Sequence, residues 1–212
     1  MSARTGSARD EVLRRIRSAL DGSEPAPEVP RDYRRAADHA PGSPEVVDRL
    51  AETVADYKAT VHRVGPGGVA AAVAGLLARH TRVAVPPGLD EAWTADAGCE
   101  VVRDAGRLDT AALDGVDAVV TGCATAIALT GTIVLDASPD QGRRALTLVP
   151  DHHVCVVLAE QVVDSVPEAI ARLDPLRPTT FISGPSATSD IELNRVEGVH
   201  GPRTLDVVLV SG

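Results

Sequence analysis

Short apolar runs alternate with stretches of helical periodicity along most of this chain. Runs typical of buried strands occupy residues 60–64, 83–85, 100–103, 117–121, 132–135, 145–149, 154–158, 179–183 and 205–210. Apolar residues recur at helical spacing in residues 44–57, 69–79, 89–97 and 166–173. Strands that alternate with helices are typical of a parallel α/β sheet. The pattern therefore predicts an α/β fold with a mostly parallel sheet.

The second half of the chain departs from this alternation. The runs at 132–135, 145–149 and 154–158 follow one another through short turns. Strands joined in this way favour some antiparallel pairing. We therefore expect the sheet to be partly mixed.

The first 42 residues have a different character. Ser7 and Asp10 resemble a capping box, and the apolar residues from Val12 to Leu20 then recur at helical spacing. Residues 21–44 are rich in Pro, Gly, Ala and charge, with little periodicity. We expect residues 1–42 to form a helical arm with a linker, and residues 43–212 to form one domain. The arm is either a disordered tail or a docking helix, and we favour docking on its own domain.

Composition excludes several classes of function. The 212 residues carry 21 basic and 30 acidic side chains, and only 2% are aromatic. An acidic chain with few aromatic rings is poorly suited to nucleic acids, because it repels phosphates and cannot stack bases. No apolar run approaches the ~20 residues of a membrane span, and the charged amino terminus does not resemble a secretion signal. We therefore expect a cytoplasmic protein.

Motifs that bind metals are also missing. Cys99, Cys123 and Cys155 stand far apart, without a Cys-x-x-Cys pair, so we expect no iron–sulfur cluster or structural zinc in this chain. The thiols are expected to be reduced and mostly buried. His152 and His153 are adjacent on a predicted strand, so they point to opposite faces and cannot easily share a metal. One of them facing a cleft is the alternative to one solvated and one hydrogen-bonded histidine.

Two familiar motifs are incomplete. The segment 65–70 fits the G-x-G-x-x-A dinucleotide pattern, but Pro66 removes a donor and no acidic residue ends the next strand. A plain strand-to-helix turn is the better interpretation. Ser186, Asp190 and His200 follow the order of an α/β-hydrolase triad, but Thr188 replaces the last glycine of the nucleophile elbow. We reject a hydrolase triad.

Polar blocks in mid-chain and near the carboxyl terminus carry the candidate chemistry. Small residues at 121–131 would let a ligand approach the backbone, although tight packing requires the same residues. Arg203 is suited to bind a carboxylate or phosphate, and His200 to exchange a proton. The ligand-binding candidates are Thr125, Thr130, Gly131, Thr132, Gly184, Ser186, Thr188, His200 and Arg203. The catalytic candidates are His200, Glu192 and Asp190, which do not make a complete catalytic constellation.

The stretches at 119–135, 150–153, 183–192 and 198–203, in this order, resemble the LUD-domain family, in particular its lactate utilization protein C type. The resemblance implies a three-layer α/β/α fold of the NagB/RpiA/CoA-transferase-like type. It also implies a part in oxidising L-lactate to pyruvate, within a complex whose iron–sulfur clusters lie in partner proteins. A small carboxylate or nucleotide-like ligand is expected. Leu129 stands where the family is expected to have an acidic or polar residue. If that position contacts a polar ligand in the family, this protein is expected to bind its ligand differently or not at all.

Two other functions remain open. Fold class alone would allow a stand-alone acyl-CoA or sugar-phosphate enzyme, in which Glu192 is the best-placed nucleophile. The polar blocks would merely close turns in a non-catalytic scaffold or regulator.

Overall fold

The computed structural model describes residues 7–22, 27–106, 108–185, 187–188, 196–197 and 201–212, with the backbone alone at 187–188 and 196–197. The chain divides into two compact units, Met1–Tyr33 and Arg34–Gly212. The first unit contains α1 (Ala8–Leu20), as predicted, and the Ser7 hydroxyl caps it by accepting a hydrogen bond from the Asp10 backbone. None of the α1 residues is buried. No helix of the described residues is long and apolar enough to cross a membrane.

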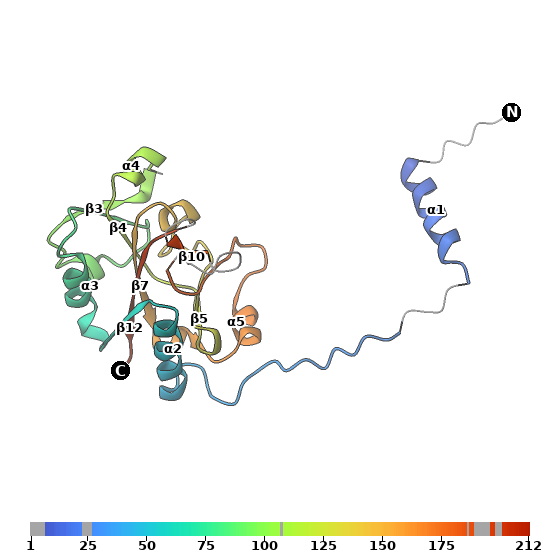
Figure 1. Cartoon of the computed structure of the whole chain (residues 1–212), viewed down its shortest axis with the longest axis horizontal. Helices are drawn as coiled ribbons and strands as arrows, with labels where there is room; N and C mark the ends of the chain where they lie inside the picture. Colours follow the sequence, from blue (N-terminus) through green and yellow to red (C-terminus); the bar gives the residue numbers. More distant parts are fainter. Residues whose placement is uncertain (1–6, 23–26, 107, 186, 189–195, 198–200) are drawn as a thin grey trace. The chain divides into compact units, whose positions relative to one another are not determined.

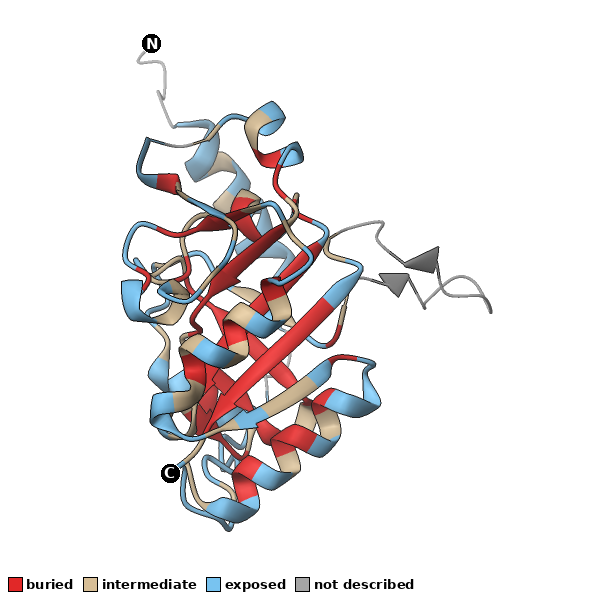
Figure 2. Cartoon of the chain, turned by 90° about the vertical axis from the view of Figure 1, so that its left-hand side faces the viewer, coloured by how far each residue is buried: buried red, intermediate tan, exposed pale blue. Residues whose placement is uncertain are grey.

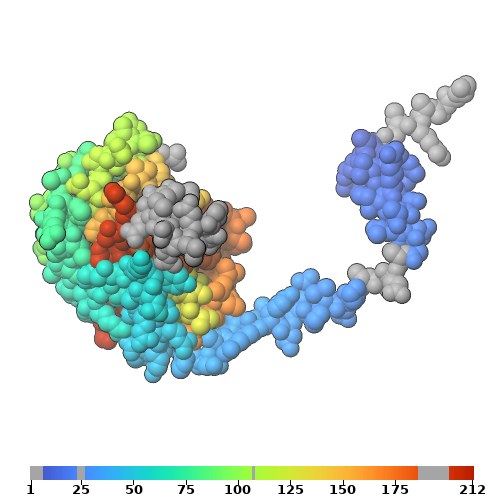
Figure 3. All heavy atoms as spheres, viewed as in Figure 1, coloured from blue at the N-terminus to red at the C-terminus, as the bar shows by residue number. Residues whose placement is uncertain are grey.

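A six-stranded sheet forms the centre of the second unit (Figure 1). All its neighbouring strands pair in parallel. Their order across the sheet is β1 (Thr60–Val64), β12 (Thr204–Val210), β7 (His152–Leu158), β4 (Ala118–Thr121), β2 (Arg82–Val85) and β3 (Glu100–Arg103). In the space-filling view, the red carboxyl-terminal strand lies beside the cyan region that contains β1 (Figure 3). The predicted α/β class with a mostly parallel sheet is confirmed.

Both faces of this sheet are covered, so its central strands are buried almost along their whole length (Figure 2). Val154 and Val156 of β7 pack with α3 (Val69–Leu77) on one face. Cys155 and Val157 pack on the other face with α2 (Pro44–Asp56). Successive strand residues point to opposite sides, and this explains why β7 is apolar without alternation.

A second sheet shares the α2 face. It contains four strands in the order β8 (Val162–Val163), β5 (Thr125–Ile127), β6 (Thr132–Leu135) and β9 (Thr180–Ile182). The β5–β6 and β6–β9 pairs are antiparallel. The expected mixed pairing therefore exists, but in a separate sheet and not inside the main one. α5 (Val166–Arg172) packs on β5, and the backbone at β10 (Ala187–Thr188) and β11 (Val196–Glu197) forms an antiparallel pair.

Two predicted elements are wrong in type, and short ones were missed. The run at 145–149 is not a strand but a 3-10 turn, η5 (Arg144–Thr147), which places Leu146 in the core beside Val119. The region 89–97 contains only the 3-10 turn η2 (Glu91–Thr94). A five-residue apolar run can form either a strand or a helical turn, and tertiary packing decides between the two. The missed elements include α4 (Thr110–Asp114), β5 and β8.

The carboxyl ends of β2 and β4 are closed by the segment that follows β6. The Gly88 backbone donates to the Pro139 carbonyl at 2.8 Å, and the Gly122 backbone donates to the Asp140 carbonyl at 3.0 Å. A Cβ atom at Gly122 would lie 2.2 Å from a carboxylate oxygen of Asp140. Ligands of open α/β sheets usually bind at the carboxyl ends of strands. Here the chain itself fills that position over β2 and β4.

A hydrogen-bonded row of polar side chains crosses the α3 face. Asp206 of β12 contacts His62 Nε2 at 2.6 Å and His152 Nε2 at 2.7 Å, and His152 Nδ1 lies 2.8 Å from His80 Nε2. Burial would raise the pKa of Asp206, but the hydrogen bonds with His152 and His62 outweigh it and lower the pKa. The Asp206 carboxylate is therefore stabilised in its charged form.

Replacing Gly131 is expected to destabilise the domain. Gly131 ends the turn after β5 with φ +57°, and a Cβ atom there would lie 2.8 Å from the Thr53 carbonyl of α2. Gly131→Ala should therefore lower the free energy of unfolding by about 1–3 kcal/mol, measured by urea denaturation. Gly75→Ala is the control and should be neutral or stabilising, because Gly75 lies in α3 and an added Cβ would meet nothing within 4 Å beyond the adjacent helix backbone. Equal stability of the two variants would contradict the packing argument.

Acid should weaken the fold through Asp206. Its folded pKa lies below the ordinary value of 3.8, so its contribution is complete above about pH 4 and is lost as pH falls through the folded pKa. Asp206→Asn should lower the free energy of unfolding by about 1–3 kcal/mol at neutral pH and should lose less on acidification than the wild type. Urea denaturation across an acid pH series measures both effects. The exposed Asp114→Asn is the control, and a matching pH profile for both variants would refute this role.

Candidate functional site

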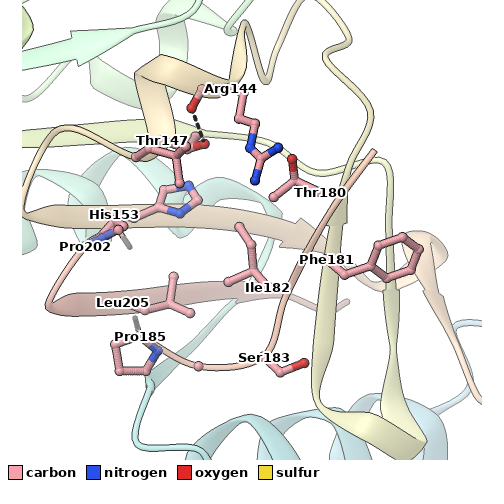
Figure 4. Close-up of a pocket in the computed structure, with 13 residues that line it drawn as sticks. Arg144, Thr147, His153, Thr180, Phe181, Ile182, Ser183, Pro185, Pro202 and Leu205 are labelled. Atoms are coloured by element: carbon pink, nitrogen blue, oxygen red, sulfur yellow. Dashed lines mark hydrogen bonds between the residues drawn. The ribbon is translucent and has the colours of Figure 1, made fainter. Parts of the chain in front are cut away.

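A cavity of about 270 Å³ opens between η5, the first residues of β7 and β12, and the segment that follows β9 (Figure 4). Both neighbouring strands of the main sheet contribute their second residue, His153 from β7 and Leu205 from β12. The cavity therefore lies toward the amino ends of these parallel strands. The residues that line it are Arg144, Thr147, Leu148, His153, residues 180–185, Gly201, Pro202 and Leu205.

The Ser183-Gly184-Pro185 block reaches the cavity because the chain bends sharply at Gly184. Gly184 has φ +81°, a conformation that favours glycine. A Cβ atom there would lie 2.3 Å from the Tyr57 carbonyl, so this backbone packs directly on the end of α2. Only glycine fits both conditions. Gly184 therefore allows this segment to pack on Tyr57, and this packing places Ser183 and Pro185 at the border of the cavity.

His153 is a buried polar group of the cavity, together with Thr147. Its Nε2 lies 2.8 Å from the Thr121 hydroxyl, and only 1% of the residue is exposed. His152, its neighbour in the chain, contacts His80 and Asp206 on the opposite face. The inference that adjacent histidines face opposite sides is confirmed. Neither histidine is solvated, and His153 lines the cavity, so the alternative with one histidine facing a cleft describes the structure.

Arg144 supplies the positive charge. Figure 4 shows its side chain extending from η5 toward Thr180, whereas the Phe181 ring points away from the cavity. Among the described residues, no carboxylate pairs with the Arg144 guanidinium. By contrast, the adjacent Arg143 binds Asp104 at 2.7 Å. A guanidinium with no carboxylate partner among these residues, beside the threonines of the cavity, is suited to bind a small anion.

The mid-chain threonines lie next to this cavity without lining it. The Thr132 hydroxyl is 2.8 Å from that of Ser183, and the Thr130 hydroxyl is 2.8 Å from that of Thr132. Gly131 packs on Thr53. The structure therefore brings the Thr130–Thr132 turn and the Ser183 block together through side-chain hydrogen bonds.

Other predicted site residues have different surroundings. Thr125 is fully buried and donates to the Gln161 carbonyl at 2.8 Å. Arg203 is exposed and binds Asp151 through two 2.6 Å hydrogen bonds, which lower the pKa of that carboxyl group. Leu129 is 60% exposed and borders another surface hollow, beside Asp164. None of these three residues lines the cavity.

Five candidates cannot be placed in this way. Ser186, Asp190, Glu192 and His200 lie outside the described residues, and Thr188 is described only as backbone of β10. Their assignment stays a prediction from the sequence.

Sequence reasoning missed the cation of the cavity, and it gave the cavity histidine only as one of two alternatives for the His152–His153 pair. Arg144 was hidden because its neighbourhood was predicted as a strand, and an arginine before an apolar run is an ordinary surface residue. His153 had a usable signal, since the parity of β7 places it on the α2 face, where the strand is otherwise apolar. A buried histidine on such a face requires a polar partner or a cavity.

Comparison with known proteins gives consistent results. The sequence model of the LUD domain matches residues 47–210. A lactate utilization protein C from Deinococcus radiodurans is 44% identical over 211 residues, which cover 98% of this chain and 97% of that protein. A lactate utilization protein C from Bacillus subtilis is 32% identical over 127 residues, 56% of this chain and 49% of the relative. The crystal structure of a DUF162 family protein from Deinococcus radiodurans superimposes with a TM-score of 0.69 at 41% identity, covering 79% of this chain and 97% of that one.

Two arginine variants distinguish the cavity from the surface pair. Arg144→Gln should weaken binding of a small carboxylate such as pyruvate at least about tenfold, because it removes the charge that faces the cavity. Arg203→Gln should leave the affinity within about twofold, since Arg203 pairs with Asp151 outside the cavity. Isothermal titration calorimetry on the full chain measures both. The reverse order of effects would place the anion site at Arg203, as the sequence pattern suggested.

Proposed function

Since this chain belongs to the LUD-domain family, we propose that it is a component of a lactate-utilization system, supporting the oxidation of L-lactate to pyruvate. The nearly full-length likeness to a lactate utilization protein C supports the system. The cavity beside Arg144 and His153 supports a small carboxylate as the ligand. This cavity is the observation on which the ligand assignment depends.

The chemistry of the ligand fits the lining. Lactate and pyruvate both combine a carboxylate with an oxygen on the adjacent carbon. In the proposed complex, Arg144 binds the carboxylate, and the Thr180 hydroxyl provides a further hydrogen bond. His153, held by Thr121, offers a polar group at the cavity wall. Leu148 and Leu205 cover the apolar part of the ligand.

We propose that the electrons leave through partner proteins. Oxidation of lactate to pyruvate releases two electrons and two protons, and an iron–sulfur cluster is a suitable one-electron acceptor. The three cysteines of this chain do not have the spacing of cluster ligands. We therefore assign the clusters to partner subunits, and we assign to this chain the binding of the organic ligand.

Growth on lactate tests the proposal. A strain lacking the chain should fail to grow on L-lactate as the sole carbon source but should grow normally on glucose. The wild-type gene should restore growth, and Arg144→Gln should restore it at a rate reduced several-fold, because the variant binds the carboxylate more weakly. Arg203→Gln is the matched control and should restore growth fully.

The outcomes separate the parts of the proposal. Normal growth of the deletion strain on lactate would overturn the role in lactate utilization. Full complementation by Arg144→Gln would retain that role and reject the cavity as its ligand site. Purification of a tagged chain from lactate-grown cells should bring down cluster-containing proteins, and their absence would reject the partner assignment.

A further inference from the structure

The buried imidazole of the cavity has one nitrogen with a hydrogen-bond partner and one without. His153 Nε2 lies 2.8 Å from the Thr121 hydroxyl, whereas Nδ1 makes no hydrogen bond with the described part of the chain. Among the described residues, the fully buried side-chain nitrogen and oxygen atoms that lack a partner are Ser43 Oγ and Arg82 Nε. Nδ1 is therefore not sealed in the core, and it opens on the cavity that His153 lines (Figure 4).

A chain of hydrogen bonds leads away from Nε2 into the core. The Thr121 hydroxyl donates to Cys155 Sγ at 3.8 Å, and the Cys155 thiol donates to the Gly122 carbonyl at 3.6 Å. His153, Thr121 and Cys155 are each at most 1% exposed. Because these groups are buried, their hydrogen bonds are made with one another and not with bulk water.

The last member of this chain of hydrogen bonds sets its direction. A backbone carbonyl only accepts, so the Cys155 thiol donates its one hydrogen to Gly122. The Thr121 hydroxyl then donates its own hydrogen to Cys155, and its oxygen is left to accept from His153 Nε2. The neutral ring therefore carries its hydrogen on Nε2, which leaves a lone pair on Nδ1. In this form His153 presents a hydrogen-bond acceptor to the cavity.

We propose that the cavity selects 2-hydroxycarboxylates over the corresponding 2-oxo acids, because His153 Nδ1 accepts a hydrogen bond from the hydroxyl group of the ligand. This inference rests on the proposed function, in which Arg144 binds the carboxylate. A hydroxyl group can donate to Nδ1, whereas the keto oxygen of a 2-oxo acid can only accept. Two acceptors that face each other in a buried site are left without partners, and this lowers affinity. Thr121 is the positioning residue that fixes the form of the ring.

This preference has a consequence for the proposed oxidation. Oxidation of lactate converts its hydroxyl group to a keto group, so pyruvate lacks the hydrogen that His153 Nδ1 binds. The site therefore binds the substrate more tightly than the product, and the difference favours release of pyruvate.

Nitrogen-15 NMR of the full chain tests the form of the ring without any ligand. In mildly alkaline buffer, where histidines are ordinarily neutral, His153 should show a protonated Nε2 and an unprotonated Nδ1. Its signals are assigned by their loss in His153→Gln. A protonated Nδ1 in the wild-type protein would overturn the proposal.

Isothermal titration calorimetry of the full chain measures the ligand preference. L-lactate should bind about tenfold more tightly than pyruvate, and more tightly than propionate, which has the carboxylate but no hydroxyl group. Thr121→Val should reduce the ratio of the lactate and pyruvate affinities to about two or less, and Thr121→Ser should restore it. Thr53→Val is the matched control, because the Thr53 hydroxyl donates to the Ala128 carbonyl outside the cavity, and it should keep the wild-type ratio.

The outcomes separate this inference from the proposed function. Equal or tighter binding of pyruvate by the wild-type protein would overturn the preference and would retain the carboxylate site at Arg144. If neither acid binds, the ligand assignment of the proposed function is rejected and the preference is rejected with it. An unchanged ratio in Thr121→Val would reject Thr121 as the positioning residue. The wild-type measurements decide the preference itself, even where a variant folds poorly.

Discussion

The alternation of side chains along β7 is the constraint on which most of this molecule depends. Because the strand lies in the middle of a parallel sheet, each of its side chains must enter one of two cores. One parity sends His152, Val154 and Val156 to the α3 face, and the other sends His153 and Cys155 to the α2 face. The cavity histidine and the contact of His152 with Asp206 both follow from this choice. A shift of one residue in register would exchange all these side chains between the two faces.

Polar residues in these cores are tolerated because they have partners. Asp206 is held by two histidines, and His153 is held by the Thr121 hydroxyl. Each contact joins different strands, so the polar groups fix how neighbouring strands align as well as satisfying one another. The same demand explains the mid-chain threonines. The Thr132 hydroxyl of β6 is hydrogen-bonded to Ser183, which follows the antiparallel neighbour β9, and this contact joins the second sheet to the edge of the cavity.

The sequence predicted the parallel sheet well because its strands are apolar on both faces and are separated by helices. The prediction of a strand failed at 145–149, where an apolar run also suits a 3-10 turn, which buries Leu146 and packs Ala145 and Val149 against the same core. For the site, motif blocks located Gly184 and the Gly201–Pro202 turn near one cavity. They could not reveal Arg144, because its lack of a carboxylate partner among the described residues is a property of its three-dimensional surroundings. Arg203 has the same chemistry in the sequence, yet Asp151 pairs with it.

The position and size of the cavity constrain the choice among ligands. A nucleotide of the doubly wound folds would bind at the carboxyl ends of the strands. Over β2 and β4 that position is filled by Pro139 and Asp140, whose carbonyls bind the backbone of Gly88 and Gly122. The cavity at the amino ends of β7 and β12 measures about 270 Å³, below the roughly 300–1,000 Å³ of pockets that hold drug-sized ligands. As the described residues line it, it suits a three-carbon carboxylate better than an acyl-CoA. Size and charge therefore favour the lactate proposal over a stand-alone acyl-CoA enzyme, for which fold class is the main argument.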